Sequence, residues 1–247
     1  SPPCSSFSVA GVREKKWGKE HHFREGQAKQ VLDDLFFHFI EVARILQPKV
    51  VVAENVKGLI LGNAKGYIKE IFQSFRSAGY ESQLFLLNSV AMGVPQRRER
   101  TFFIARRRDL FIPPIRLSFC EPEIPLKKAF VGITEKGKDK SHSIYFPFWK
   151  KAKPFQNFSL VNPSGSGFTL YKMSPDRSCS TLTATSSALY HWETMRNFSK
   201  TEFCRIQSFP DDFEFINQNP GYICGMSVPP FMMQRIAHQI DLQLLCQ

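Results

Sequence analysis

Apolar residues in the first third of the chain recur at helical spacing in two stretches. Between Gln27 and Gln47 they follow the 4-4-3-4 intervals of one helix face, at Val31, Leu35, Phe39, Val42 and Leu46. Pro48 ends this pattern, because proline cannot continue a helix. A second stripe predicts a helix from about Gly66 to Ala78, with Gly79 as its C-terminal cap.

Three short apolar runs alternate with these helices and predict strands. They lie at Val50–Ala53, Leu84–Leu87 and Thr101–Ala105, and the first is continuously apolar, as expected of a parallel strand covered on both faces. Helices alternating with such strands are typical of an open α/β sheet. Ligands bind such sheets at the carboxyl ends of the strands, so Glu54, directly after the first run, is a candidate site residue.

The pattern changes from about Arg107 to Arg196. Prolines become frequent, helical periodicity disappears, and aromatic residues mix with cations at Tyr145–Lys151. These features predict a separate, smaller, irregular and β-rich module, in which the aromatics could bind nucleic acid or form a core.

Helical signals return after this module. Ser199 and Glu202 have the spacing of a capping box, with Phe198 and Phe203 as its hydrophobic staple. A closing helix is expected to begin near Ser227, which can cap it, and to bury the apolar residues Met233, Ile236, Ile240 and Leu244.

Charge is the one feature of the composition that indicates a class of partner. The 247 residues carry 33 Lys and Arg against 22 Asp and Glu, a formal charge of +11, which favours a polyanion such as nucleic acid over an ordinary basic surface. The six cysteines show no spacing suited to zinc, so we expect reduced thiols and no metal. No apolar run reaches the roughly 20 residues that a membrane span needs.

Four short motifs carry candidate chemistry. Cys4 follows a proline pair and could be an accessible nucleophilic thiol, although a free cysteine is more often a buried apolar residue. Downstream lie Glu54-Asn55-Val56, the stretch Gln96–Arg100, and Gly225–Pro230. In this order the four motifs resemble those of the cytosine-5 DNA methyltransferase family: Pro-Cys, Glu-Asn-Val, Gln-x-Arg-x-Arg and Gly-Asn-Ser-Val-Pro.

The resemblance implies roles for four catalytic residues. Cys4 would add to C6 of a flipped-out cytosine, and Glu54 would hydrogen-bond the ring nitrogen and amino group. Arg100 would hold the O2 atom, where negative charge accumulates, and Arg98 would steady the loop or the DNA phosphates.

The resemblance also implies S-adenosylmethionine as the methyl donor. Its peripheral contacts would be Pro3, Leu35 and Ser227, whereas the family's main donor site lies upstream of the Pro-Cys motif. Because Ser1 falls inside that motif, we expect a chain cut off before it, unable to bind the donor alone. Met226 replaces the Asn of the family's Gly-Asn-Ser-Val-Pro motif, which puts any contact of that Asn in doubt.

The family's domain plan predicts three segments. Residues 1–108 would be a Rossmann-like catalytic domain, incomplete at its N-terminus, and residues 109–212 a target recognition domain. Residues 213–247 would return to the catalytic domain. The predicted DNA contacts are Ser8, Gln96, Thr181 and Thr183.

These inferences favour a bacterial or phage modification enzyme acting on double-stranded DNA. We expect a cytoplasmic protein, monomeric at full length, with a cognate restriction endonuclease as a genetic partner. Two alternatives remain open: a catalytically inert DNA-binding fragment, and a related enzyme that methylates RNA.

Overall fold

The computed structural model describes residues 20–21, 30–31, 35–61, 65–184 and 188–246. The predicted site residues Pro3, Cys4 and Ser8 lie outside these ranges. The chain divides into two compact units. The first unit comprises Ser1–Leu87, Glu99–Leu117 and His238–Gln247, and the second comprises Asn88–Arg98 and Ser118–Ala237. This division differs from the predicted segments 1–108, 109–212 and 213–247.

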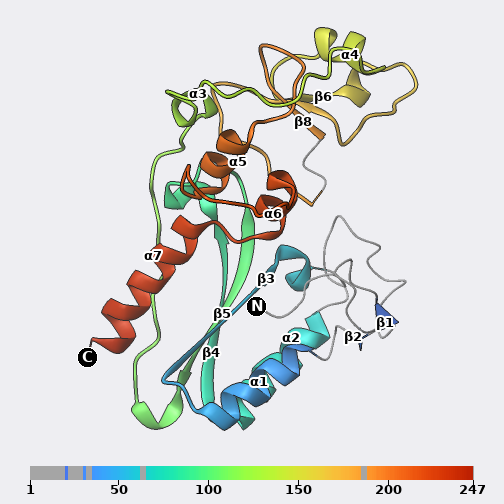
Figure 1. Cartoon of the computed structure of the whole chain (residues 1–247). Helices are drawn as coiled ribbons and strands as arrows, with labels where there is room; N and C mark the ends of the chain where they lie inside the picture. The colour runs from blue at the N-terminus through green and yellow to red at the C-terminus, as the bar shows by residue number, and fades with distance from the viewer. Residues whose placement is uncertain (1–19, 22–29, 32–34, 62–64, 185–187, 247) are drawn as a thin grey trace. The chain divides into compact units, whose positions relative to one another are not determined.

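The first unit is built on a three-stranded sheet with helices α1 and α2 beside it (Figure 1). The strand order is β3-β5-β4. The elements are α1 (Leu35–Leu46), β3 (Val50–Val56), α2 (Lys65–Ser77), β4 (Tyr80–Asn88) and β5 (Glu99–Arg107), with short helices η2 (Lys57–Ile60) and η5 (Arg108–Leu110). A two-residue pair, β1 (Glu20–His21) and β2 (Gln30–Val31), and a π-helical turn, η8 (Asp241–Leu245), complete the described part.

Strand β3 pairs with β5 in antiparallel register, from Val50 opposite Arg106 to Val56 opposite Arg100. The sequence predicted a parallel strand, Val50–Ala53, with Glu54 at its end. The observed strand is longer, so Glu54 lies within the ladder. Among the described strands its hydrogen-bonded neighbour is antiparallel.

The core of the first unit is aromatic and lies between the sheet and the two helices. Phe36 contacts the rings of Tyr67, Phe75 and Phe103 edge to face, with centroids 5.3 to 6.5 Å apart. Such contacts add to the stabilisation from burial alone.

The predicted stripe of α1 is wrong. Val42 and Leu46 are 52% and 71% exposed, and the helix buries Phe36, Ile40 and Ala43 instead. Apolar residues lie on more than one face of this helix, so periodicity could not identify the face that packs.

The second unit is largely irregular, with strands of two residues each. Its sheet has the order β6-β7-β8, with β6 antiparallel and β8 parallel to β7. The elements are η4 (Ser89–Met92), α3 (Leu126–Ala129), α4 (Phe146–Lys151), β6 (Gln156–Asn157), η6 (Phe158–Leu160), β7 (Tyr171–Lys172), β8 (Leu189–Tyr190), α5 (Lys200–Gln207), α6 (Pro220–Met226) and α7 (Pro230–Ile240), whose last three residues belong to the first unit.

Helix α5 begins as the sequence predicts. Ser199 Oγ accepts the N–H of Glu202, and the Glu202 carboxylate accepts the N–H of Ser199, which confirms the capping box. The Phe198 and Phe203 rings pack at 5.9 Å. Arg196 forms a bidentate pair with the same carboxylate, at 2.7 Å to each oxygen. The start of this helix is therefore fixed by buried charge as well as by its cap.

Candidate active site

Glu54 and Arg100 form the central pair of the first unit. Their strands place them diagonally on one face of the ladder, because Glu54 is opposite Phe102 and Arg100 is opposite Val56. Arg100 Nε lies 3.0 Å from Glu54 Oε1, and the two side chains are only 13% and 15% exposed. The sheet thus holds a carboxylate and a guanidinium in contact without shielding them completely from a ligand.

Neighbouring contacts hold the backbone under this pair. Thr101 Oγ1 donates to the carbonyl of Asn55 at 3.0 Å, and Asn55 Oδ1 accepts the N–H of Val56 at 2.9 Å. Lys57 Nζ pairs with Glu99 across the strands at 2.8 Å. The Asn of the Glu-Asn-Val motif therefore fixes the strand and does not point at the ligand side.

Arg98 has a different environment from Arg100. Its side chain is fully buried in the second unit, where Nη1 donates to the Leu182 carbonyl at 2.7 Å and Nη2 to the Gly225 carbonyl at 2.8 Å. The sequence predicted that it steadies the loop or the DNA phosphates. A side chain with no exposed surface has no atom to offer a phosphate, so this placement favours a structural part.

Gln96 is also fully buried, although a contact with DNA was predicted for it. Its Oε1 accepts the N–H of Leu182 at 2.9 Å, and its Nε2 donates to the side chain of Gln207. The predicted contacts Thr181 and Thr183 are exposed in the segment that Gln96 holds. Thr181 Oγ1 donates to the Arg97 carbonyl at 2.6 Å.

Of the residues predicted to contact S-adenosylmethionine, Leu35 and Ser227 lie in the described part of the chain. Leu35 opens α1 and is half-buried, so it keeps apolar surface for van der Waals contact. Ser227 Oγ donates to the Cys224 carbonyl at 3.1 Å and accepts from Gln207 Nε2 at 3.0 Å. The N–H of Phe231, at the start of α7, donates to Ser208 and not to Ser227. Leu35 therefore keeps some apolar surface, whereas the Ser227 hydroxyl is engaged by Cys224 and Gln207.

Met226 and Gly225 are neighbours in one motif but differ in their surroundings, since the first is exposed and the second is closely packed. Met226 is 57% exposed at the end of α6, so the replaced Asn position faces solvent. A Cβ on Gly225 would lie 2.1 Å from the Thr183 carbonyl oxygen, closer than any side chain can approach. The glycine is therefore required by the Thr183 backbone that passes over it.

Gln207 and Glu123 were not predicted as site residues. Gln207 lies in the stretch Arg205–Pro210, which resembles the Arg-x-Gln-x-Phe-Pro motif of the cytosine-5 DNA methyltransferase family, and its side chain is fully buried. Glu123 accepts the N–H and hydroxyl of Ser178 and pairs with Arg97 at 3.0 Å, contacts that hold its pKa below the usual range. Both residues fix segments next to the predicted DNA contacts.

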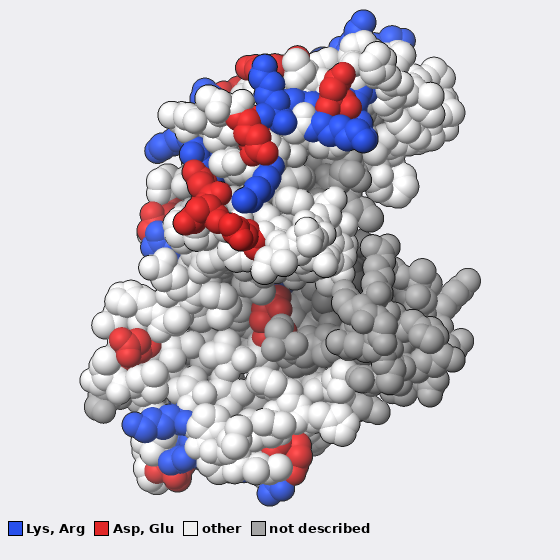
Figure 2. All heavy atoms as spheres, viewed as in Figure 1, with Lys and Arg blue, Asp and Glu red and all other residues white. Residues whose placement is uncertain are grey.

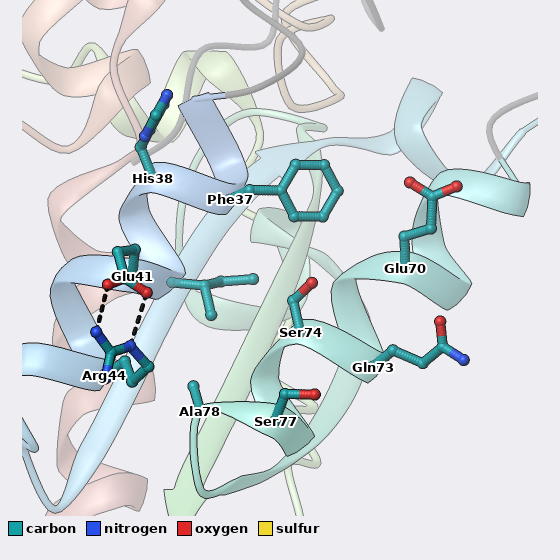
Figure 3. Close-up of a pocket in the computed structure, with 10 residues that line it drawn as sticks. Phe37, His38, Glu41, Arg44, Glu70, Gln73, Ser74, Ser77 and Ala78 are labelled. Atoms are coloured by element: carbon teal, nitrogen blue, oxygen red, sulfur yellow. Dashed lines mark hydrogen bonds and ion pairs between the residues drawn. The ribbon is translucent and has the colours of Figure 1, made fainter.

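A separate groove lies between α1 and α2, with a volume of about 720 Å³ (Figure 3). Phe37 points from α1 toward α2, and an exposed pair between Glu41 and Arg44 lies on the α1 side. The groove is lined by polar, charged and apolar side chains, and none of the predicted site residues lines it.

The surface charge of the second unit is mixed on the face shown in Figure 2, where acidic and basic side chains are interspersed over the part carrying α3 and α5.

Within the described ranges, no three His, Cys, Asp or Glu side chains cluster as metal ligands. None of the helices described is long and apolar enough to cross a membrane.

Comparison with known proteins decides what this site belongs to. The sequence profile described as C-5 cytosine-specific DNA methylase matches residues 1–242. This chain belongs to that family. It is 29% identical to the type II methyltransferase M.FnuDI of Fusobacterium nucleatum, over 97% of this chain and 74% of the relative. It is also 29% identical to M.NgoPII of Neisseria gonorrhoeae, over 98% of this chain and 76% of the relative.

Solved structures of methyltransferases share the fold. A DNA modification methyltransferase encoded within an E. coli prophage superposes with a TM-score of 0.66 at 20% identity, covering 87% of this chain and 75% of that one. The Entamoeba histolytica methyltransferase EhMeth gives 0.63 at 15% identity, covering 98% and 76%. The Rossmann-like methyltransferase fold predicted from the sequence is thereby confirmed, and a family of DNA methylases implies DNA as substrate.

Proposed function

We propose that this protein transfers a methyl group from S-adenosylmethionine to carbon 5 of cytosine within a specific sequence of double-stranded DNA. The observation that supports this best is the Glu54–Arg100 pair, held on one face of two strands in a chain of this family. A cytosine taken out of the stack presents O2, N3 and the amino group along one edge. A guanidinium beside a carboxylate supplies the donor and acceptors that this edge requires.

The chemistry begins at Cys4, which loses its thiol proton to solvent and, as a thiolate, forms a bond from sulfur to C6 while the C5–C6 double bond of the ring opens. Glu54 shares a proton with N3, so the ring accepts the electron pair of the new bond and C5 becomes nucleophilic. Arg100 donates hydrogen bonds to O2, where negative charge develops. When bound, S-adenosylmethionine supplies an electrophilic methyl group. The C5 proton then leaves to a base, the C6–S bond breaks, and the aromatic ring is restored.

Other predicted residues act on binding. We assign Thr181 and Thr183 to DNA contact, because their side chains are exposed. We assign Gln96 and Arg98 to positioning, since both are fully buried. Leu35 and Ser227 would touch the edge of the donor. Cys4, Pro3 and Ser8 keep the roles that the family resemblance implies.

The test uses the protein as its gene encodes it. Labelled S-adenosylmethionine is incubated with DNA or RNA of mixed sequence, and the polymer that gains label is identified. We expect label in DNA at C5 of cytosine, and none with the Cys4→Ser variant, whose DNA affinity should be nearly unchanged. Labelled RNA and unlabelled DNA would overturn the proposal, as would near wild-type methylation by Cys4→Ser.

A second measurement tests the covalent step. In DNA with fluorine at C5 of the target cytosine, no proton can leave C5, so the C6–S bond should persist after methylation. We expect a complex of wild-type protein and this DNA that survives denaturation, and no such complex with Cys4→Ser.

The biological setting is also proposed. We expect a monomer working in the cytoplasm of a bacterial or phage-infected cell, with a cognate restriction endonuclease as its genetic partner. The named relatives are type II methyltransferases, which supports this setting.

A further inference from the structure

The paired strands of the first unit end close to the catalytic pair. The last register partners of β3 and β5 are Val56 and Arg100, and beyond them the chain enters η2. Glu54 comes shortly before this end, and Arg100 lies at the end itself. Strand ends open more readily than strand centres, so register alone gives these two side chains less support than a central position would.

The hydroxyl of Thr101 adds hydrogen bonds at this end of the ladder. Thr101 is opposite Asn55 and fully buried, and its Oγ1 donates to the carbonyls of Asn55 and Val56 at 3.0 and 3.3 Å. Asn55 Oδ1 accepts the N–H of Val56 at 2.9 Å. Both polar groups of the peptide that joins Asn55 to Val56, directly after Glu54, are therefore bonded to side chains.

Thr101 lies on the opposite face of the sheet from the catalytic pair. Side chains alternate along a strand, so Thr101 shares the face of Ala53 and Phe103, which belong to the aromatic core. Glu54 and Arg100 lie on the other face. Because Thr101 is fully buried on the core face, it does not reach a base bound beside the pair. Any effect of its hydroxyl on catalysis passes through the backbone of β3.

Packing does not require this hydroxyl. Valine has nearly the same shape as threonine and would fill the same core position, whereas burying a hydroxyl costs desolvation that its hydrogen bonds must offset. What the hydroxyl adds is a fixed place for the carbonyls that follow Glu54. Such precision matters at a reacting group, where a misplacement of about 1 Å costs up to about 10²-fold in rate.

We propose that Thr101 is a positioning residue for the Glu54 carboxylate. Its hydroxyl fixes the end of β3, and thereby the place of the carboxylate relative to Arg100 and to N3 of the bound cytosine. This inference rests on the role proposed for Glu54 in methyl transfer. It predicts that loss of the hydroxyl slows the chemical step and leaves DNA binding unchanged.

Two substitutions separate the hydroxyl from the packing of the same side chain. Thr101→Val keeps the volume and removes the hydrogen bonds, whereas Thr101→Ser keeps the hydroxyl and removes a methyl group from the core. Ile104→Val is the matched control, because Ile104 is also buried in β5 and this change removes one carbon and no hydrogen bond. We expect each variant to fold, with a melting temperature lowered by roughly 2–4 °C.

The first readout is the steady-state kinetics of the protein as its gene encodes it. We expect Thr101→Val to lower kcat about 10-fold, equivalent to about 1.4 kcal/mol, with KM for DNA within about 2-fold of wild type. Thr101→Ser and Ile104→Val should both keep kcat within about 2-fold of wild type. If kcat instead follows the melting temperature of the variants, Thr101 is a packing residue and the inference fails.

The second readout isolates the covalent step. With DNA that carries fluorine at C5 of the target cytosine, formation of the denaturation-resistant complex is followed in a single turnover. We expect Thr101→Val to form this complex about 10-fold more slowly than wild type, but to the same final amount. A wild-type rate would overturn the inference.

Glu54→Gln is measured in parallel, so that the two proposals fail differently. A slow Glu54→Gln variant beside a normal Thr101→Val variant rejects the positioning role of Thr101 alone. If Glu54→Gln itself forms the complex at the wild-type rate, the proposed role of Glu54 is wrong, and the inference about Thr101 falls with it.

Discussion

The two compact units hold their functional side chains in different ways. In the first unit, Glu54 and Arg100 are placed by the register of a seven-residue antiparallel pairing over an aromatic core. In the second unit, the strands are two residues long, and the side chains of Gln96 and Arg98 bond the N–H and the carbonyl of Leu182. In a region with such short strands, buried polar side chains make the hydrogen bonds to peptide groups that strand pairing would otherwise make.

Arg98 and Arg100 show this difference two residues apart. One donates to two carbonyls and is fully buried, and the other pairs with a carboxylate on a partly exposed face. Their motif is one sequence signature, but its two arginines belong to different units. Substitutions should therefore separate stability from catalysis.

The largest effect should come from Arg98→Met. It leaves the carbonyls of Leu182 and Gly225 without their donor in a buried environment, at about 1–3 kcal/mol each. We expect the free energy of unfolding to fall by about 3–5 kcal/mol in urea denaturation. The matched control is Arg97→Met, whose exposed pair with Glu123 should be worth less than about 1 kcal/mol. Equal losses for both variants would erase the contrast between the units.

Next in size is Glu54→Gln, which keeps the shape of the side chain and weakens proton sharing with the base. We expect kcat to fall by about 10²-fold or more, equivalent to about 2.7 kcal/mol, with little change in melting temperature. Arg100→Lys should also lose most activity, since a point charge cannot reproduce a planar fork. Full activity in both variants would contradict the assignment of the pair.

The sequence could predict what depends on local pattern. The α5 capping box, the two-helix order and the strands at Val50 and Thr101 follow from spacing and residue type. Pattern could not show that Gln96 and Arg98 turn inward, because burial of a polar side chain depends on which distant carbonyls it meets. The packed face of α1 was missed for a related reason: its tertiary neighbours, and not its periodicity, select it.

A smaller effect should appear in the second unit on acidification. Burial lowers the pKa of His191 to about 3, and its ring stacks on Trp192 at 3.8 Å. Because the folded pKa lies below the unfolded value of about 6.5, protons bind the unfolded chain preferentially. The contribution of neutral His191 to the free energy of unfolding is fully present above pH 6.5. The free energy of unfolding should fall by about 1 kcal/mol between pH 6.5 and 5.5. His191→Asn should flatten this part of the pH profile, and an unchanged slope would place the titration elsewhere.

The smallest effect should come from the Lys57–Glu99 pair beside the catalytic strands. Both side chains are 39% exposed, so water and salt screen their attraction. We expect Lys57→Met to change the free energy of unfolding by about 0.5 kcal/mol or less, and the difference to vanish in about 1 M salt. If strand register positions the catalytic side chains of the first unit, the variant should keep kcat within about 2-fold of wild type. A loss of several kcal/mol would mean that polar side chains hold the first unit as they hold the second, and the contrast between them would fail.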